Sequence, residues 1–99
     1  MPKIKKIEYI HDDVVFKTQY LYWCLGCGYD HAFALKGEGG HHDFFNGDLD
    51  KPTVSPSLVQ NFTPGKMCHS FIKEGKIQYL SDCHHKLAGQ TIELPEYPE

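Results

Sequence analysis

The sequence predicts a mainly β fold, a small single domain of antiparallel hairpins stapled by a zinc-ribbon-like site of four cysteines, with at most one short helical turn. Aromatic and β-branched residues dominate, while glycine and proline interrupt the chain every few positions. A chain of 99 residues buries only a modest core, so a metal staple would matter. We expect one domain over residues 1–99, with its core in 6–94 and a tail at 95–99.

The first strands are expected in the first third of the chain. Residues 13–24, DVVFKTQYLYWC, alternate in polarity and predict a strand with both faces partly covered. A shorter strand is expected over residues 6–10. After a CxxC turn, residues 31–36, HAFALK, are expected to form the hairpin mate of the long strand. Residues 37–51 are glycine-rich and predict turns.

The second half contains the clearest hairpin signal. Pro52 and Pro56 disfavour a central strand, so we expect only an edge strand over residues 57–62. Residues 68–83, CHSFIKEGKIQYLSDC, predict a hairpin with Glu74 and Gly75 at its tip. The remaining expected elements are a helical turn over residues 86–88 and a strand over residues 90–94.

The CxxCG stretch predicts a metal knuckle. Cys24 and Cys27 lie two residues apart, and Gly28 permits a positive φ that closes a tight turn around a metal. The redox alternative requires a CxxC at the start of a helix in a βαβ setting, and neither is indicated here. Cysteines of cytosolic proteins stay reduced, which also favours a metal over disulfides.

Cys68 and Cys83 are the expected partners of the knuckle. A two-residue turn at Glu74 and Gly75 places both cysteines diagonally on one face of the hairpin, within reach of a single metal. The predicted ligands of a structural zinc are therefore Cys24, Cys27, Cys68 and Cys83. Two alternatives remain open: one of the ligands is His69, His84 or His85, or all four cysteines are buried free thiols.

Several histidines lie close to the cysteines in sequence. One interpretation gives them supporting roles around the metal; the other gives them catalytic roles, as ligands of a second metal or as acid and base. The candidate residues for catalysis are His69, His85, Asp82 and His31, with Asp48 as a further acidic group. The segment FNGDLDKPTVSPS either forms ordinary turns or lines a ligand groove with the polar residues Asn46, Asp48, Asp50, Ser55 and Ser57.

The charge of the chain argues against nucleic acid as a partner. The formal net charge is −3, and arginine is absent. A nucleic-acid-binding zinc ribbon would need a basic surface, and only the KIKK stretch at residues 3–6 offers one. No apolar run is long enough to span a membrane, and acidic residues interrupt the N-terminal run where a signal peptide would be apolar. We therefore expect a cytoplasmic protein.

The assembled motifs resemble those of a known family. CxxCG followed by a histidine, FNGDLxKPTxSPS, and CHSFIxxGxIQxLSDCxHxLAGQT are similar to a family of small uncharacterised proteins of bacteriophages and prophages, a domain of unknown function with some members labelled ammonia monooxygenase. The resemblance covers residues 22–94 and implies a phage or prophage origin and a metal, but no activity. If phage-encoded, the protein is expected in the cytoplasm of the host cell. The chain has Leu25 where the family usually has proline, and His84 where it favours a smaller polar residue. The residues that match the pattern are Cys24, Cys27, His31, Cys68, His69, Cys83 and His85.

These observations favour a protein-interaction module with a structural zinc over an enzyme. The module would bind an unknown protein partner through an exposed apolar patch built from Phe44, Phe45 and Phe62. The alternative is a metal-assisted hydrolase that uses His69 and His85 beside the thiolate site. The third hypothesis is the nucleic-acid-binding zinc ribbon.

Overall fold

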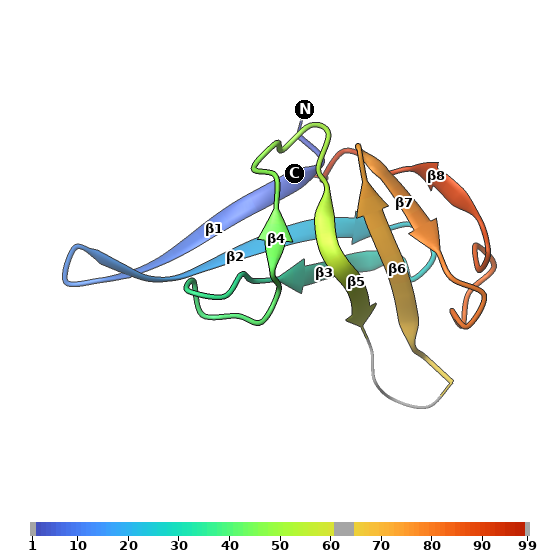
Figure 1. The fold of residues 1–99 in the computed structure, drawn as a ribbon, viewed down its shortest axis with the longest axis horizontal. Coiled ribbons are helices and arrows are strands. Elements are labelled where there is room, and N and C mark those ends of the chain that lie inside the picture. The colour runs from blue at the N-terminus through green and yellow to red at the C-terminus, as the bar shows by residue number, and fades with distance from the viewer. Residues whose placement is uncertain (1, 61–64, 99) are drawn as a thin grey trace.

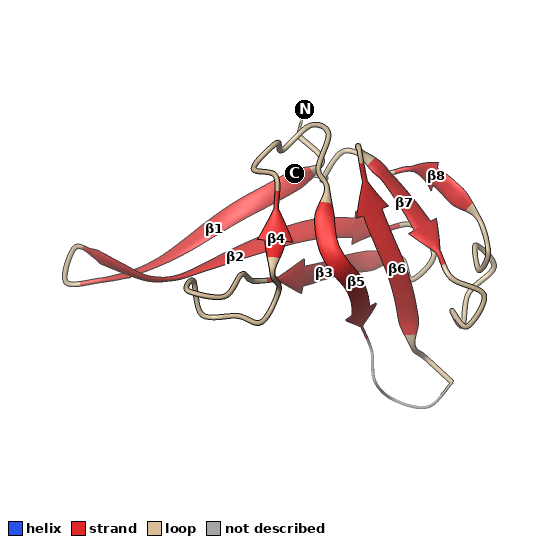
Figure 2. Ribbon diagram, in the orientation of Figure 1, coloured by secondary structure: helices blue, strands red, loops and turns tan. Residues whose placement is uncertain are grey.

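The computed structural model describes residues 2–60 and 65–98. Its regular structure consists of strands arranged in two antiparallel sheets, and the described residues contain no helix (Figure 2). The prediction of an all-β fold is therefore confirmed.

The first sheet has three strands in the order β1-β2-β3. They are β1 (Ile4–His11), β2 (Val14–Cys24) and β3 (Tyr29–Phe33), so the predicted N-terminal strands are present and β3 is the hairpin mate of β2. The hairpin of β1 and β2 extends well beyond the second sheet (Figure 1). Its tip turns through Asp12 and Asp13, both with positive φ, and every residue from 8 to 16 is exposed.

The second sheet has five strands in the order β4-β5-β6-β7-β8. They are β4 (Phe44–Phe45), β5 (Val54–Gln60), β6 (Cys68–Lys73), β7 (Lys76–Tyr79) and β8 (Thr91–Glu93). Its strands cross in front of the first sheet in Figure 1, and the hydrophobic core is built from buried side chains of both sheets. The largest fully buried side chains include Ile4 and Tyr22 from the first sheet and Leu58, Ile72, Ile77 and Tyr79 from the second.

The prediction of an edge strand over residues 57–62 is wrong in position. β5 begins at Val54 and lies inside the sheet, between β4 and β6; residues 61 and 62 lie outside the described residues. A bulge explains how a strand containing Pro56 fits there. Val54 pairs with Ile72 and Leu58 pairs with Ser70, so three residues of β5 oppose one of β6. Bulges of this kind are common beside active sites because they re-aim a side chain.

The hairpin of β6 and β7 has the predicted tip at Glu74 and Gly75, and Ser70 faces Tyr79 as its register requires. Beyond Tyr79 the chain leaves the sheet, so Cys83 lies in a turn rather than on a strand. The helical turn expected over residues 86–88 is replaced by hydrogen-bonded turns, with Ala88 N donating to His85 O at 3.2 Å.

The apolar patch expected from Phe44, Phe45 and Phe62 is not formed as predicted. Phe44 is exposed, but the ring of Phe45 packs edge-on against Tyr20, with ring centroids 4.9 Å apart. Phe62 lies outside the described residues. Exposed apolar side chains gather instead on the arm formed by β1 and β2, where they are Tyr9, Ile10, Val14, Val15 and Phe16.

Candidate active site

The outer face of β5 and β6 carries a serine beside a histidine. On β6 the residues alternate, with Cys68, Ser70 and Ile72 buried and the residues between them turned outward. His69 therefore lies on the outer face, directly opposite Val59 of β5. Ser57 lies two residues before Val59 and shares its face, which makes Ser57 the diagonal neighbour of His69.

Ser57, His69 and Asp82 form a continuous hydrogen-bonded chain. The Oγ of Ser57 lies 3.0 Å from Nε2 of His69. On the other side of the ring, Nδ1 of His69 lies 3.2 Å from Oδ2 of Asp82. With the imidazole proton on Nδ1, the histidine donates to the carboxylate and accepts the hydroxyl proton of Ser57. This is the geometry of a serine–histidine–aspartate triad.

The turn that follows β7 holds Asp82 in place. Leu80 N donates to His69 O at 2.9 Å, which extends the hairpin pairing by one step. Cys83 then fastens the turn to the same histidine from both sides, because its Sγ accepts from His69 N at 3.2 Å and donates to His69 O at 2.9 Å. Asp82, one residue before Cys83, is thereby fixed beside the imidazole.

All three side chains of the triad are at least partly accessible to solvent. The side chain of His69 is 24% exposed and that of Asp82 is 48% exposed, while Ser57 is half-buried. A hydroxyl bonded to a neutral imidazole nitrogen can be deprotonated as it attacks a carbonyl, so the arrangement suits nucleophilic acyl transfer.

Behind the triad, on the inner side of the sheet, three cysteines and a histidine converge. The potential ligand atoms of Cys24, Cys27, Cys68 and His31 all lie within 4.8 Å of one another. The knuckle has the predicted form, since Gly28 has a φ of +81° and Gly28 N donates to Cys24 O at 2.8 Å. The described residues thus contain a group that can hold a metal ion.

The donor set of this group fits a tetrahedral, thiolate-binding cation. Sγ of Cys24 and Sγ of Cys68 lie 3.8 Å apart, and two thiolates on one tetrahedral zinc are separated by about 3.8 Å. His31 is buried, and its Nε2 has no hydrogen-bond partner among the described residues. A buried polar nitrogen beside a thiol cluster is costly unless it finds a partner such as a metal.

The thiols of the group influence one another strongly. The hydrogen bond from Cys68 lowers the pKa of Cys24 despite its burial, and the nearby side chains of His31 and Tyr79 act in the same direction. The same bond raises the pKa of Cys68, and burial raises the pKa of Cys27 to about 11. The thiols alone therefore favour one thiolate at a time, whereas a bound divalent cation would ionise every thiol that coordinates it.

Cys83 belongs to a second, overlapping group with Cys68 and His85. The Nε2 of His85 lies 3.5 Å from Sγ of Cys68, and the ring packs edge-on against Tyr79. The exposed His84 reaches Cys27 instead, with Nε2 3.3 Å from its Sγ. Three of the four predicted zinc ligands thus meet in the first group. Cys83 lies in the second group, which shares Cys68 with the first. The four-cysteine set stays a prediction.

The candidate catalytic residues named from the sequence are separated by the structure. His69 and Asp82 come together in the triad, while His31 and His85 lie in the two cysteine groups. Asp48 belongs to none of these groups. Its carboxylate stabilises a turn by accepting hydrogen bonds from the backbone N–H groups of Asp50 and Lys51.

A family model supplies the identification. The model described as "Bacterial ubiquitination-like system serine protease (BubE)" matches residues 2–80. The chain belongs to the BubE family. The matched region contains Ser57 and His69 and ends two residues before Asp82. No curated protein and no solved structure gives a significant match.

Membership of the BubE family overturns the function expected from the sequence. The prediction was an interaction module with a structural zinc, yet the family is named for a serine protease. The metal-assisted hydrolase and the nucleic-acid-binding ribbon gain no support from it either. The family is bacterial, as the resemblance in part implied, while the phage or prophage origin stays a prediction. The described part of the chain holds no helix that could cross a membrane.

Sequence reasoning missed Ser57 as a candidate nucleophile and placed it only among the polar residues of a turn. The missing signal was the pairing of β5 with β6, which brings Ser57 beside His69. The hairpin register alone could have placed Asp82 near His69, because Leu80 faces His69 and Asp82 follows two residues later.

Proposed function

We propose that the chain is a serine protease in which Ser57 is the nucleophile, His69 the general base and Asp82 the group that orients the histidine. The observation that carries this proposal is the hydrogen-bonded chain from Ser57 Oγ through His69 to Asp82. The printed description of the BubE family supports it independently, because a serine protease requires an activated serine.

In the proposed reaction, Ser57 Oγ attacks the carbonyl carbon of a substrate peptide bond while His69 Nε2 removes its proton. The imidazolium is stabilised by the Asp82 carboxylate at Nδ1. His69 then passes the proton to the departing amine, which leaves an acyl-enzyme ester on Ser57. A water molecule, deprotonated by the same nitrogen, hydrolyses this ester and restores the serine. The family description supports a substrate within a bacterial ubiquitination-like system.

We also infer that the cysteine group binds a structural zinc ion. Thiolate and imidazole donors in a buried, four-ligand set are typical of structural zinc sites. Bound there, the metal would supply a crosslink between the β2–β3 hairpin, which bears Cys24 and Cys27, and the start of β6. Cys68 and His69 are consecutive residues, so this crosslink would fix the strand end that carries the catalytic base.

A fluorophosphonate probe tests the proposed nucleophile. We expect stoichiometric phosphonylation of the folded protein, because an imidazole-paired serine reacts with such probes whereas an ordinary serine hydroxyl does not. Peptide mapping by mass spectrometry should place the adduct on Ser57 and not on Ser55, two residues earlier in the same strand. His69→Ala should abolish labelling. An unlabelled protein, or an adduct that persists without His69, would overturn the assignment.

Cobalt substitution identifies the fourth ligand of the metal. Cys24, Cys27 and Cys68 are common to the predicted set and the observed group, and the fourth position falls to Cys83 or to His31. The intensity of the thiolate-to-cobalt charge-transfer band in the near ultraviolet scales with the number of thiolates. With Cys83 as ligand, Cys83→Ala should lower this band by about a quarter while His31→Ala leaves it unchanged. With His31 as ligand, the absorption assigned to three thiolates should survive Cys83→Ala.

A further inference from the structure

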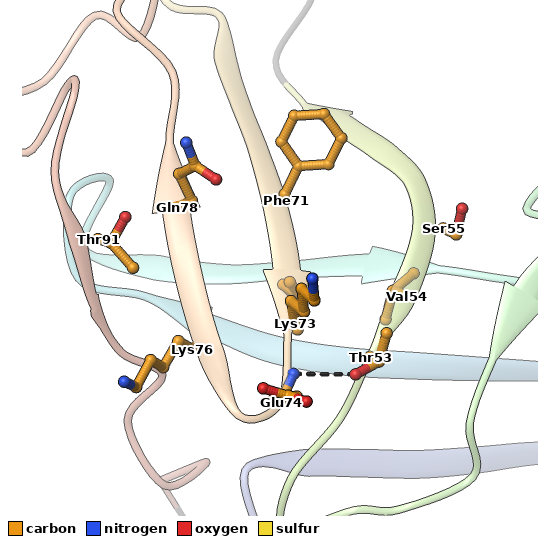
Figure 3. Close-up of a pocket in the computed structure, with 10 residues that line it drawn as sticks. Thr53, Val54, Ser55, Phe71, Lys73, Glu74, Lys76, Gln78 and Thr91 are labelled. Carbon is orange, nitrogen blue, oxygen red and sulfur yellow. Dashed lines mark hydrogen bonds between the residues drawn. The ribbon is translucent and has the colours of Figure 1, made fainter.

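The second sheet bears a groove whose lining includes Phe71, the neighbour of His69 on the outer face of β6. It encloses about 610 Å³, within the usual range for a ligand site. Figure 3 shows Phe71 on β6, Gln78 on β7 and Thr91 on β8 standing out from the neighbouring strands. The residues that line the groove include Val54, Phe71, Lys73, Glu74, Lys76 and Gln78.

The groove lies next to the catalytic histidine, because its lining residue Phe71 is the outward neighbour of His69 on β6. His69, Phe71 and Lys73 are successive outward residues of β6, and the rings of His69 and Phe71 lie 6.5 Å apart between centroids. The side chain of Phe71 is left exposed although it is a large aromatic group. An exposed aromatic ring beside the catalytic histidine is well placed to contact the substrate.

The far end of the groove is positively charged. Lys73 and Lys76 face each other directly across the hairpin of β6 and β7, an arrangement of like charges that is unfavourable by itself. Lys73 forms no ion pair with any described residue. Glu93, opposite Lys76, is bonded to Lys3 Nζ at 2.9 Å. The lining contains one carboxylate, that of Glu74, against the two lysines. A carboxylate from outside would relieve this repulsion.

We propose that this groove is the specificity site of the protease and receives an extended peptide with an apolar side chain against Phe71 and an acidic side chain between Lys73 and Lys76. Outward residues of a strand repeat about every 6.7 Å, and an extended substrate has the same repeat. The apolar residue therefore lies two positions, and the acidic residue four positions, from the residue at the triad, both on one side of the scissile bond. The inference rests on the proposed function, because the substrate positions are counted from the residue held at the triad.

Cleavage profiling tests this assignment. A proteome-derived peptide library is digested with the full chain, and cuts also produced by Ser57→Ala are subtracted. We expect enrichment of apolar residues two positions, and of Asp or Glu four positions, to one side of the cut. Lys73→Glu should lower the preference for an acidic over a basic residue by about fivefold or more, as expected for an exposed ion pair replaced by repulsion. Phe71→Ala should lower the apolar preference by about tenfold.

A matched variant and a binding measurement make the outcome decisive. Lys6→Glu makes the same charge change on β1, at an exposed position of the other sheet, and should leave the profile unchanged. Binding of a fluorescent peptide with Leu and Glu two residues apart, measured by anisotropy on Ser57→Ala, should weaken with Lys73→Glu and with Phe71→Ala but not with Lys6→Glu. Ser57-dependent cleavage without these preferences, or peptide binding indifferent to both groove variants, overturns the groove assignment. A library with no Ser57-dependent cuts counts against the proposed function, and the binding series still decides the groove.

Discussion

Ser57→Ala is expected to abolish hydrolysis while leaving the fold intact. The substitution removes the nucleophilic Oγ from a half-buried position and keeps the backbone of β5 unchanged. In triad enzymes, loss of the serine lowers kcat by a factor on the order of 10⁵–10⁶. Turnover of peptides recovered from the cleavage library, followed by mass spectrometry, would measure the loss, and thermal unfolding would show an unchanged Tm.

The triad also makes a prediction about combined substitutions. His69→Ala should cost about as much as Ser57→Ala, and the double variant should be no worse than either single variant, because the residues act as one unit. Asp82→Asn should lower kcat by a factor on the order of 10⁴, since it disturbs the tautomer of the histidine. Ser81→Ala, at an exposed serine beside Asp82, is the matched control and should retain full activity. Additive losses in the double variant would contradict a shared catalytic unit.

Removal of the metal is expected to unfold the protein and so to abolish activity indirectly. Structural zinc sites contribute about 10–16 kcal/mol of apparent binding free energy, which matches or exceeds the whole stability of a typical small domain, about 5–15 kcal/mol. Cys68→Ser should have the same effect, because Cys68 belongs to both of the overlapping groups. Circular dichroism and thermal unfolding of the reduced protein, before and after exhaustive chelation, would measure the change.

The Ser57→Ala variant separates loss of fold from loss of catalysis in this experiment. It should bind one equivalent of zinc, unfold on chelation and refold on return of zinc, although it never hydrolyses substrate. Magnesium, which prefers oxygen ligands, should not replace zinc. A reduced, metal-free protein that kept its cooperative transition and its Tm would show that the cysteine group does not hold the fold together.

The sequence correctly predicted those parts of the fold that depend on residues close together in the chain. Strict alternation gave β2, and the Glu74–Gly75 turn gave the hairpin of β6 and β7 with its register. The knuckle at Cys24 and Cys27 followed from the spacing of its cysteines and from Gly28. In each case the partners are close in sequence, so few alternative pairings compete.

The position of Ser57 in the active site depends on the pairing of β5 with β6, which no local pattern specifies. Pro56 made an interior strand unfavourable, yet the bulge in β5 places the proline where no ladder partner is needed. An edge strand expected over residues 57–62 has no specified neighbour, so the sequence pattern does not bring Ser57 next to His69. Searches for short catalytic motifs do not find such a site, because a triad is defined by the positions of its side chains in space and not by residues adjacent in the sequence.

The order of the triad along the chain carries an evolutionary consequence. Serine comes first, histidine second and aspartate last, all within the meander from β5 to the turn after β7. This order differs from those of the two large serine-protease folds and of the α/β-hydrolases. The same set of catalytic side chains in a different chain order, on a different fold, is what convergence produces.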